Sequence, residues 1–255
     1  MSSELSMIII GDIGNTDTKI CIINSNYKII KRILLPTKKI NNSLLAKKLS
    51  FAVKRNTSIK KSLFCSVVPN KFLLIKSFLQ KKMKIKCTEL KKLNFEKIMK
   101  IKVNRHQIGS DRLANSIAVI SKNKNFIILD FGTATTFDVI TNNVYNGGVI
   151  APGVDLSLNT LIKKASLIPL MNLKKTKKVI GKNTINAVRS GFFWGYTGLI
   201  DNIIGLIMKE TKKKFKIIIT GGFSKLFTNS LKSKVLIDKD ITIKGLIRTV
   251  KLIDF

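Results

Sequence analysis

Two short motifs in this chain carry the residues best suited to phosphate chemistry. Each is an apolar run that ends in Asp-x-Gly, with Asp12 and Gly14 in the first copy and Asp130 and Gly132 in the second. A turn that exposes a carboxylate, offers threonine hydroxyls and lets the backbone approach through glycine suits a metal-bound polyphosphate. Asp-x-Gly alone is also typical of an ordinary hairpin turn, but two matching copies favour a nucleotide site formed by both.

A third acidic residue could act on the acceptor of a phosphoryl group. Gly109-Ser110-Asp111-Arg112 precedes a stretch with helical spacing of apolar residues, so Asp111 and Arg112 would lie on the first turn of a helix. Asp111 would offer a carboxylate as general base, and Arg112 a planar donor for an anion. The alternative is that Ser110 or Asp111 caps the helix and that Arg112 is a solvated neighbour.

Glycine-rich segments elsewhere indicate places where the backbone can approach a ligand. Gly147–Gly153 ends one predicted strand, and Thr220–Gly222 ends another, where it is suited to contact a base or ribose. Gly181–Thr184 opens a long predicted helix. Small residues on one face of that helix would let another backbone or a flat ligand approach. They are Ser190, Gly191, Gly195 and Gly198.

The elements that must position these residues repeat one pattern. Apolar periodicity predicts three strands, a helix, a strand and a helix in each half, which is the order expected of two fused α/β units. In the first half we expect strands over 7–35 with a turn at 24–26, a helix at 44–54, a strand at 62–68, a helix at 72–79 and a further strand at 85–90. In the second half we expect strands at 126–130, 135–141 and 144–150, helices at 155–164 and 184–210, a strand at 215–220 and a helix after Gly222.

The composition is ordinary for a globular protein except for its charge. The chain has 255 residues, of which 45% are hydrophobic and 24% charged, and 47 Lys and Arg against 14 Asp and Glu give a net charge of +33. That is long enough for one large or two compact domains. A charge of this size suggests nucleic acid as a partner, but the lysines are spread over the whole length and few aromatic residues accompany them. We therefore disfavour nucleic-acid binding, and attribute the basic surface to the codon bias of an AT-rich genome; it would also attract anionic substrates.

The numbers and spacing of cysteine and histidine argue against a zinc protein and a disulfide-rich protein. Cys21, Cys65 and Cys87 show no CxxC spacing, and His106 is the only histidine. A zinc site and a disulfide scaffold are therefore disfavoured, and a reducing cytoplasm is indicated. No apolar run reaches the roughly 18 residues of a membrane span, and the N-terminal run is interrupted too early for a signal peptide. We expect a cytoplasmic protein without a membrane segment.

Together the motifs resemble the type III pantothenate kinase family, in the acetate and sugar kinase/Hsp70/actin superfamily. The matching segments follow the family's order: Asp12–Thr16, Gly109–Arg112, Asp130–Thr135, Gly147–Gly153, Gly181–Thr184 with Ser190-Gly191, and Thr220–Gly222. The resemblance implies an α/β fold of two fused actin-like (ribonuclease H-like) domains, 1–113 and 114–255, with a nucleotide cleft between them. It implies ATP-dependent phosphorylation of pantothenate to 4′-phosphopantothenate, the first step of coenzyme A synthesis.

The resemblance also implies a role for each motif. Asp111 would be the general base, Asp130 the ligand of a monovalent cation (K⁺ or NH₄⁺), Thr133 an ATP contact and Asp12 a magnesium ligand. The ATP phosphates would be held by Asp12, Ile13, Gly14, Asn15, Thr16, Asp17, Thr18 and Lys19. Pantothenate would be held by Gly109, Ser110, Asp111, Arg112 and Thr184. Family members are homodimers with pantothenate near the subunit boundary.

One stretch departs from the family pattern, and other functions stay open. A Tyr and an Asn-Pro pair usually precede Gly-x-Asp-Arg, whereas here Lys102 stands at the Tyr position and Arg105 at the Pro position, with Asn104 retained. This departure puts the shape of the pantothenate site in question. The alternatives are a sugar or small-acid kinase of the same superfamily, a regulatory or nucleic-acid-associated protein without turnover, and an actin-like polymer.

Overall fold

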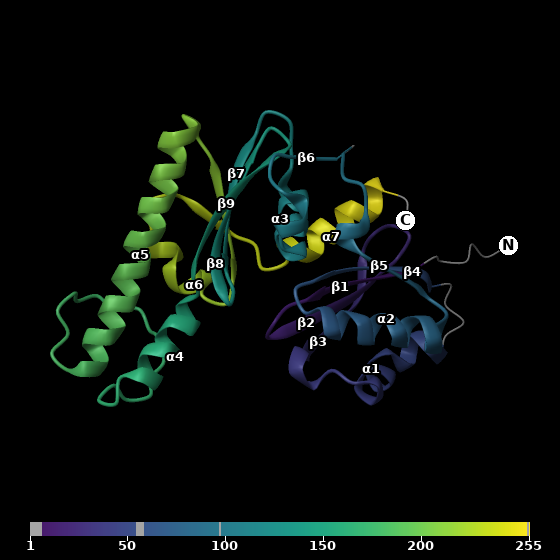
Figure 1. The fold of residues 1–255 in the computed structure, drawn as a ribbon, viewed down its shortest axis with the longest axis horizontal. Coiled ribbons are helices and arrows are strands. Elements are labelled where there is room, and N and C mark those ends of the chain that lie inside the picture. Colours follow the sequence, from purple (N-terminus) through teal and green to yellow (C-terminus); the bar gives the residue numbers. More distant parts are fainter. Residues whose placement is uncertain (1–6, 55–58, 97, 254) are drawn as a thin grey trace. The chain divides into compact units, whose positions relative to one another are not determined.

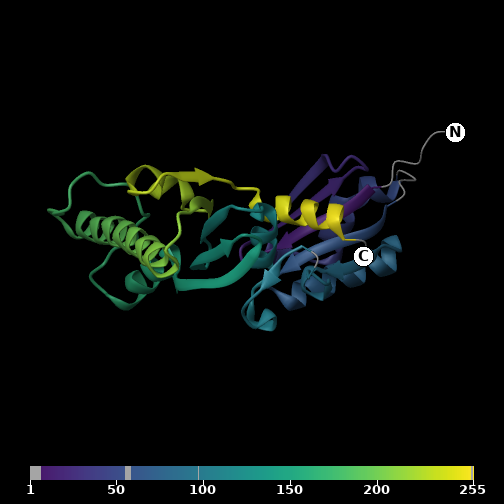
Figure 2. The same cartoon turned by 90° about the horizontal axis from the view of Figure 1, so that it is seen from above.

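The computed structural model describes residues 7–54, 59–96, 98–253 and 255. These residues form two α/β units, each built around its own sheet (Figures 1 and 2). The first unit contains the described part of Met1–Lys100 together with Asn104–Val119 and Asp240–Phe255. The second contains Ile101–Val103 and Ile120–Lys239.

The first unit has a five-stranded sheet with the order β3-β2-β1-β4-β5. β1 (Met7–Ile13), β2 (Asp17–Ile23) and β3 (Ile29–Pro36) are antiparallel neighbours, whereas β4 (Ile59–Ser66) and β5 (Lys86–Glu89) extend the sheet in parallel. A parallel partner needs a crossover, and a helix supplies it. The helices are α1 (Asn42–Lys54), α2 (Pro69–Met83), α3 (Ser110–Val119) and α7 (Ile241–Leu252), and the short 3-10 turns are η1 (Thr37–Lys39), η2 (Leu90–Lys92) and η3 (Arg105–Gln107).

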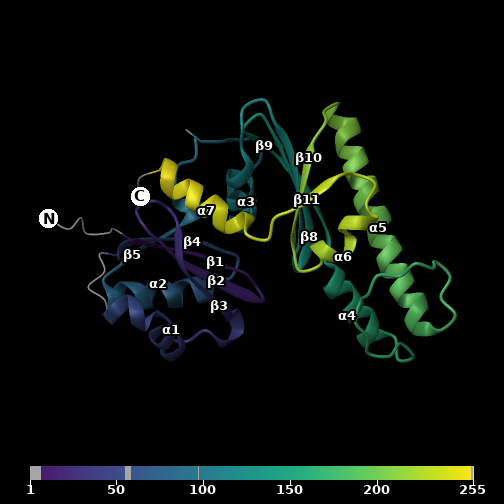
Figure 3. The same ribbon diagram turned by 180° about the vertical axis from the view of Figure 1, so that it is seen from behind.

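Different helices cover the two faces of this sheet (Figures 1 and 3). Ile9 and Ile13 of β1 belong to the core that includes buried residues of α1 and α2. α3 and α7 pack against each other and contact β4 and β1. Because strand residues alternate between faces, Asp12 lies on the opposite face from Ile9 and Ile13. The pleat therefore turns Asp12 toward the helix that carries Asp111.

A close helix crossing ties the C-terminal helix α7 to α3. A Cβ atom at Gly245 would lie 1.8 Å from the carbonyl oxygen of Ala114, so the crossing depends on glycine. Next to it the Thr242 hydroxyl donates to Oδ1 of Asn115 at 2.8 Å. The sequence-based boundary after Leu113 thus differs from the observed division, because 114–119 and 240–255 pack with the first unit.

The second unit repeats the strand order of the first. β7 (Asn125–Phe131), β8 (Ala134–Thr141) and β9 (Val144–Pro152) are antiparallel neighbours, β10 (Lys216–Gly221) and β11 (Val235–Ile237) extend the sheet in parallel, and β6 (Lys100–Ile101) is added beside β9. The helices are α4 (Val154–Lys164), α5 (Thr184–Thr211) and the short α6 (Ser224–Phe227), which the 3-10 turn η4 (Thr228–Ser230) follows. Phe193, Ile200 and Ile204 of α5 are buried in its core.

The predicted repeat is confirmed, and it places the two motifs at equivalent positions. Asp12 is the next-to-last residue of β1, and Asp130 is the next-to-last residue of β7. Asp12 pairs with Cys65 on the parallel neighbour β4, and Asp130 pairs with Thr220 on the parallel neighbour β10. The helix expected after Gly222 is only the four-residue α6. No prediction covered β6, β11 or α7.

The long helix α5 is the one described helix that is long and apolar enough, by length and composition, to cross a membrane. The sequence predicted no membrane-spanning segment. A single helix of this kind is weak evidence, because a core helix passes the same test. One side of α5 does contribute to the core of the second unit, through Phe193, Ile200, Ile204 and Ile207.

Candidate active site

The first Asp-x-Gly turn joins β1 to β2 and is held by a threonine that the sequence analysis did not single out. The Gly14 N–H donates to the Asp17 carbonyl at 3.0 Å. Thr37 braces the turn from η1: its hydroxyl donates to the Gly14 carbonyl at 2.7 Å, and its N–H donates to the Thr16 carbonyl at 2.8 Å. The turn is therefore rigid where a phosphate would meet its backbone.

The residues predicted to hold ATP phosphates divide into inward and outward sets. Ile13 and Thr18 are buried, and the Thr18 hydroxyl lies 2.9 Å from that of Thr37. Their side chains are directed into the fold, so only their backbone could reach a ligand. Asn15, Thr16 and Asp17 are exposed.

Asp12 is a carboxylate largely withdrawn from water. The pKa of Asp12 is raised from 3.8 to about 6, mainly by burial and secondarily by the nearby charge of Asp111, while the Cys65 thiol and Lys19 oppose the rise. The Cys65 Sγ donates to Oδ1 of Asp12 at 3.5 Å. Lys19 stands directly opposite Asp12 in the β1–β2 pairing. The structure thus brings Asp12 and Asp111 into electrostatic contact within the first unit.

Asp111 lies on the first turn of α3, as predicted, with its carboxylate oriented by the backbone. Its Oδ1 accepts from the Arg112 N–H at 2.8 Å. Burial raises the pKa of Asp111, and that hydrogen bond and the Arg112 charge oppose the rise. A Cβ atom at Gly109 would lie 2.5 Å from the same Oδ1, so glycine leaves the room that the carboxylate occupies.

The expectation that Ser110 caps α3 is wrong for its side chain. The Ser110 hydroxyl is buried and donates to Oε1 of Glu89 at 2.5 Å instead of accepting from the helix backbone. Glu89, at the end of β5, was not singled out from the sequence. Because the Ser110 side chain is buried and bonded to Glu89, only the backbone of Ser110 could contact a substrate.

The first unit suits a magnesium ion that is bound together with a nucleotide. Asp12 and Asp111 interact unfavourably as like charges, and a divalent cation would relieve that repulsion. Within the described ranges no three His, Cys, Asp or Glu side chains gather into a complete metal cage. Magnesium does not need one, because it is usually held by one or two carboxylates and the substrate phosphates.

The second Asp-x-Gly turn is packed by two glycines from other elements. A Cβ atom at Gly153 would lie 2.1 Å from the Thr133 carbonyl oxygen and 2.9 Å from that of Gly132. Gly221, with a φ of +87°, lies against the Phe131 backbone. The close backbone approach expected at these glycine-rich segments is thus present. A carboxylate and carbonyl oxygens in one turn are hard oxygen donors of the kind that bind K⁺.

Thr184 is the exposed first residue of α5, and the preceding residues form a well-made helix start. The Asn183 side chain accepts from the Asn186 N–H at 2.9 Å as an N-cap. A Cβ atom at Gly181 would lie 2.2 Å from the Ala187 nitrogen, so the segment is folded onto the helix. Of the predicted small-residue face, Gly191, Gly195 and Gly198 face open space, whereas Ser190 is buried and its hydroxyl donates to the Val179 carbonyl.

The segment that departs from the family pattern is divided between the units. The Lys102 N–H donates to the Tyr145 carbonyl at 3.0 Å in the second unit. Arg105 belongs to the first unit, where its guanidinium donates to the carbonyls of Lys91 and Leu93.

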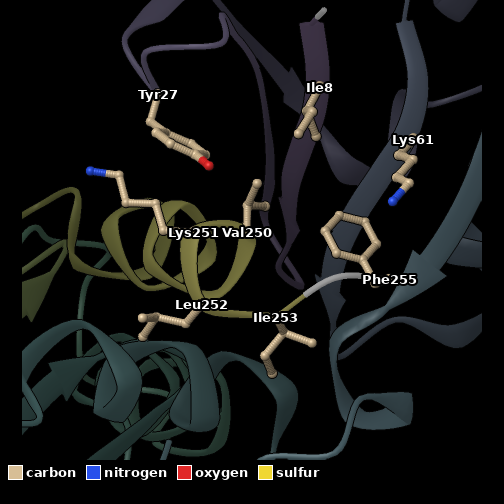
Figure 4. Close-up of a pocket in the computed structure, with 8 residues that line it drawn as sticks. All are labelled: Ile8, Tyr27, Lys61, Val250, Lys251, Leu252, Ile253 and Phe255. Atoms are coloured by element: carbon tan, nitrogen blue, oxygen red, sulfur yellow. The ribbon is translucent and has the colours of Figure 1, made fainter.

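A cavity of about 320 Å³ lies elsewhere in the first unit (Figure 4). Tyr27, Lys61 and Phe255 line it, together with Ile8 at the opposite end of β1 from Asp12. None of the carboxylates described above is among its lining residues. This cavity is therefore separate from the candidate active site.

Solved structures of other proteins share the fold of this chain. A protein described as a 2-dehydro-3-deoxygalactonokinase from Sinorhizobium meliloti matches with a TM-score of 0.59 and 11% identity, over 97% of this chain and 99% of that one. A Campylobacter jejuni protein described as a Baf family transcriptional activator matches with a TM-score of 0.60 and 18% identity, over 95% of this chain and 97% of that one. The chain has the actin-like fold of the sugar kinases, and its acidic turns suit phosphoryl transfer.

The chain belongs to the type III pantothenate kinase family, whose model matches residues 8–205. A type III pantothenate kinase of Pelagibacter ubique is 68% identical and covers 97% of this chain and 100% of its own length. Another, of a Sulfurihydrogenibium species, is 36% identical and covers 94% and 98%. The chain is thus a kinase that phosphorylates pantothenate with ATP in coenzyme A synthesis, as the sequence analysis predicted.

Proposed function

We propose that Asp111 is the general base of this kinase, and that it takes the proton of the pantothenate hydroxyl as the phosphoryl group arrives. The observation that carries the proposal is that the partly buried carboxylates of Asp12 and Asp111 lie in one unit, close enough for the charge of Asp111 to raise the pKa of Asp12. Phosphoryl transfer depends mainly on positioning and on neutralising charge, so a modest proton acceptor suffices. A carboxylate whose pKa is raised by burial is a better acceptor than an ordinary one.

The ATP phosphates are held by Asp12–Lys19. The exposed residues of the turn offer side-chain donors, and the braced backbone at Gly14 allows close approach. Asp12 is the magnesium ligand, and magnesium, when bound, neutralises charge on the phosphates. Arg112 offers a planar fork for the pantothenate carboxylate, and Gly109, Ser110 and Thr184 complete the pantothenate contacts.

The second unit supplies further contacts. Thr133 binds ATP, and Asp130 ligates a monovalent cation, K⁺ or NH₄⁺. The crowding of carbonyl oxygens at Gly153 supports an oxygen-only cation site there. Activity measured against KCl concentration tests this assignment, since Asp130→Asn should need more K⁺ for half-maximal rate.

The protein works as a cytoplasmic homodimer without membrane attachment or nucleic-acid partner. Its three described cysteines are free, which fits a reducing compartment. Sedimentation equilibrium at several concentrations tests the dimer. Binding of duplex DNA that survives physiological salt would count against the attribution of the +33 charge to codon bias.

One comparison tests the role of Asp111. Purified Asp111→Asn should fold normally, bind ATP and lose turnover by about 10²- to 10⁴-fold, the usual contribution of a general base. Asp155→Asn is a matched control, because Asp155 is an exposed residue of α4 whose carboxylate accepts a hydrogen bond from the Asn159 side chain of the same helix. Wild-type turnover in Asp111→Asn would overturn the assignment.

A further inference from the structure

A network of side chains joins the segment before Asp111 to the turn that follows β5. At one end, the Glu89 carboxylate accepts from the Ser110 hydroxyl through Oε1 at 2.5 Å and from the Lys91 N–H through Oε2 at 2.7 Å. At the other end, the Lys91 Nζ donates to the His106 carbonyl at 2.9 Å. All of these residues belong to the first unit.

Arg105 closes the network in its middle. Its terminal Nη2 donates to the carbonyls of both Lys91 and Leu93. The guanidinium also lies over the ring of buried Phe95, 4.9 Å from its centroid. A planar guanidinium can donate to two carbonyls from its edge while its face stacks on an aromatic ring.

The network lies where regular secondary structure gives little support. η2 and η3 are single 3-10 turns, and between η3 and α3 the chain passes through Ile108 and Gly109. Backbone carbonyls in such a segment need partners from side chains or water. Here Glu89 and Arg105 supply the cross-links, and the next residue after Ser110 is Asp111.

We propose that Arg105 and Glu89 are positioning residues for phosphoryl transfer to pantothenate. Their hydrogen bonds hold residues 104–110 against residues 89–95. They thereby set where the carboxylate of Asp111 and the guanidinium of Arg112 lie. The proposal rests on the proposed role of Asp111 as base. Neither residue needs to touch a substrate, because a displacement of about 1 Å in a catalytic group can cost about 100-fold in rate.

The test combines kinetics with hydrogen exchange on the full chain. Arg105→Met should raise amide exchange in the peptide that covers 104–112 and lower kcat/KM for pantothenate by about 10- to 100-fold, while KM for ATP stays within about twofold. Arg105→Lys should recover part of the loss, because its ammonium can still donate to a carbonyl. Glu89→Gln should show the same pattern and remains informative if Arg105→Met does not fold.

The matched control is Arg32→Met, which makes the same chemical change at an exposed arginine of β3 paired with Asp240. It should leave both exchange in 104–112 and pantothenate kinetics as in the wild type. Unchanged kinetics in Arg105→Met, Arg105→Lys and Glu89→Gln would overturn the proposal, even if exchange rises. Asp111→Asn distinguishes failure of the positioning role from failure of the base assignment. If Asp111→Asn is inactive while the Arg105 and Glu89 variants are fully active, only the positioning role fails. If Asp111→Asn is itself active, the base assignment fails.

Discussion

The thiol of Cys65 donates a hydrogen bond to the carboxylate of Asp12, with Sγ 3.5 Å from Oδ1. The two residues are direct partners in the parallel pairing of β4 with β1, and Cys65 is fully buried. The thiol lowers the pKa of Asp12, whereas burial and Asp111 raise it. Burial raises the pKa of Cys65 well above its ordinary value, with Asp12 as a further cause, so the sulfur stays a protonated donor.

The first prediction is that removing this donor weakens nucleotide use. Cys65→Ala should lower kcat/KM for ATP by about fivefold, because one weak hydrogen bond to a charged group is worth about 1 kcal/mol. Cys65→Ser, which keeps an O–H donor, should retain most of the wild-type value. Steady-state kinetics at saturating pantothenate measure both.

Cys87→Ala is the matched control for that experiment. Cys87 is buried on β5 of the same sheet, so its truncation leaves a similar void without touching Asp12. Both alanine variants should lose about 1 kcal/mol of stability. Equal ATP kinetics for Cys65→Ala and Cys87→Ala would refute the functional role of the thiol.

The second prediction concerns pH and stability at Asp12. Its pKa rises from 3.8 to about 6 in the folded protein, so between these values the folded state binds more protons than the unfolded state. Stability therefore falls as pH rises through this window, and the full cost is present above about pH 7. At about 1.4 kcal/mol per pKa unit, the cost is at most about 3 kcal/mol.

Asp12→Asn should remove this cost and abolish activity. The variant should be more stable than the wild type at pH 8, and the gain should shrink toward pH 5; urea midpoints followed by circular dichroism at the two pH values measure it. Glu96→Gln, which neutralises an exposed carboxylate of the same unit, should show no such pH-dependent gain. A gain in stability for Asp12→Asn that is equal at both pH values would contradict the raised pKa of Asp12.

The sequence could predict the repeated fold because its signals are local. Apolar runs ending at Asp12 and Asp130 mark strands, and the glycine after each marks a turn, so the strand order of both halves followed. Helix α7 could not be found in this way. Its sequence is rich in β-branched residues and has Gly245 at its centre, and both features lower helix propensity. Packing of that glycine on Ala114 overrides the local preference.

The candidate site shows the same division between local and distant information. Asp12, Asp111 and Asp130 stand in recognisable motifs, whereas Cys65, Thr37 and Glu89 act through partners far away in the sequence. Strand register decides that Cys65 faces Asp12, and a shift of one residue would replace it with a neighbour on the other face. No spacing rule connects Glu89 to Ser110, since loops and a strand edge bring them together.

The third prediction uses two adjacent glycines at the end of β10. Gly221 has a φ of +87°, and a Cβ atom there would lie 2.5 Å from the Phe131 carbonyl oxygen, whereas a Cβ atom at Gly222 meets nothing within 4 Å. Gly221→Ala should therefore destabilise the second unit by about 1–3 kcal/mol or more, from left-handed strain and the backbone clash. Gly222→Ala should change stability by less than about 1 kcal/mol.

Trp194, the only tryptophan, lies in this unit, so its fluorescence in urea reports the difference in stability between the two variants. Equal midpoints for the two variants would show that the Asp130 turn does not need the close contact at Gly221.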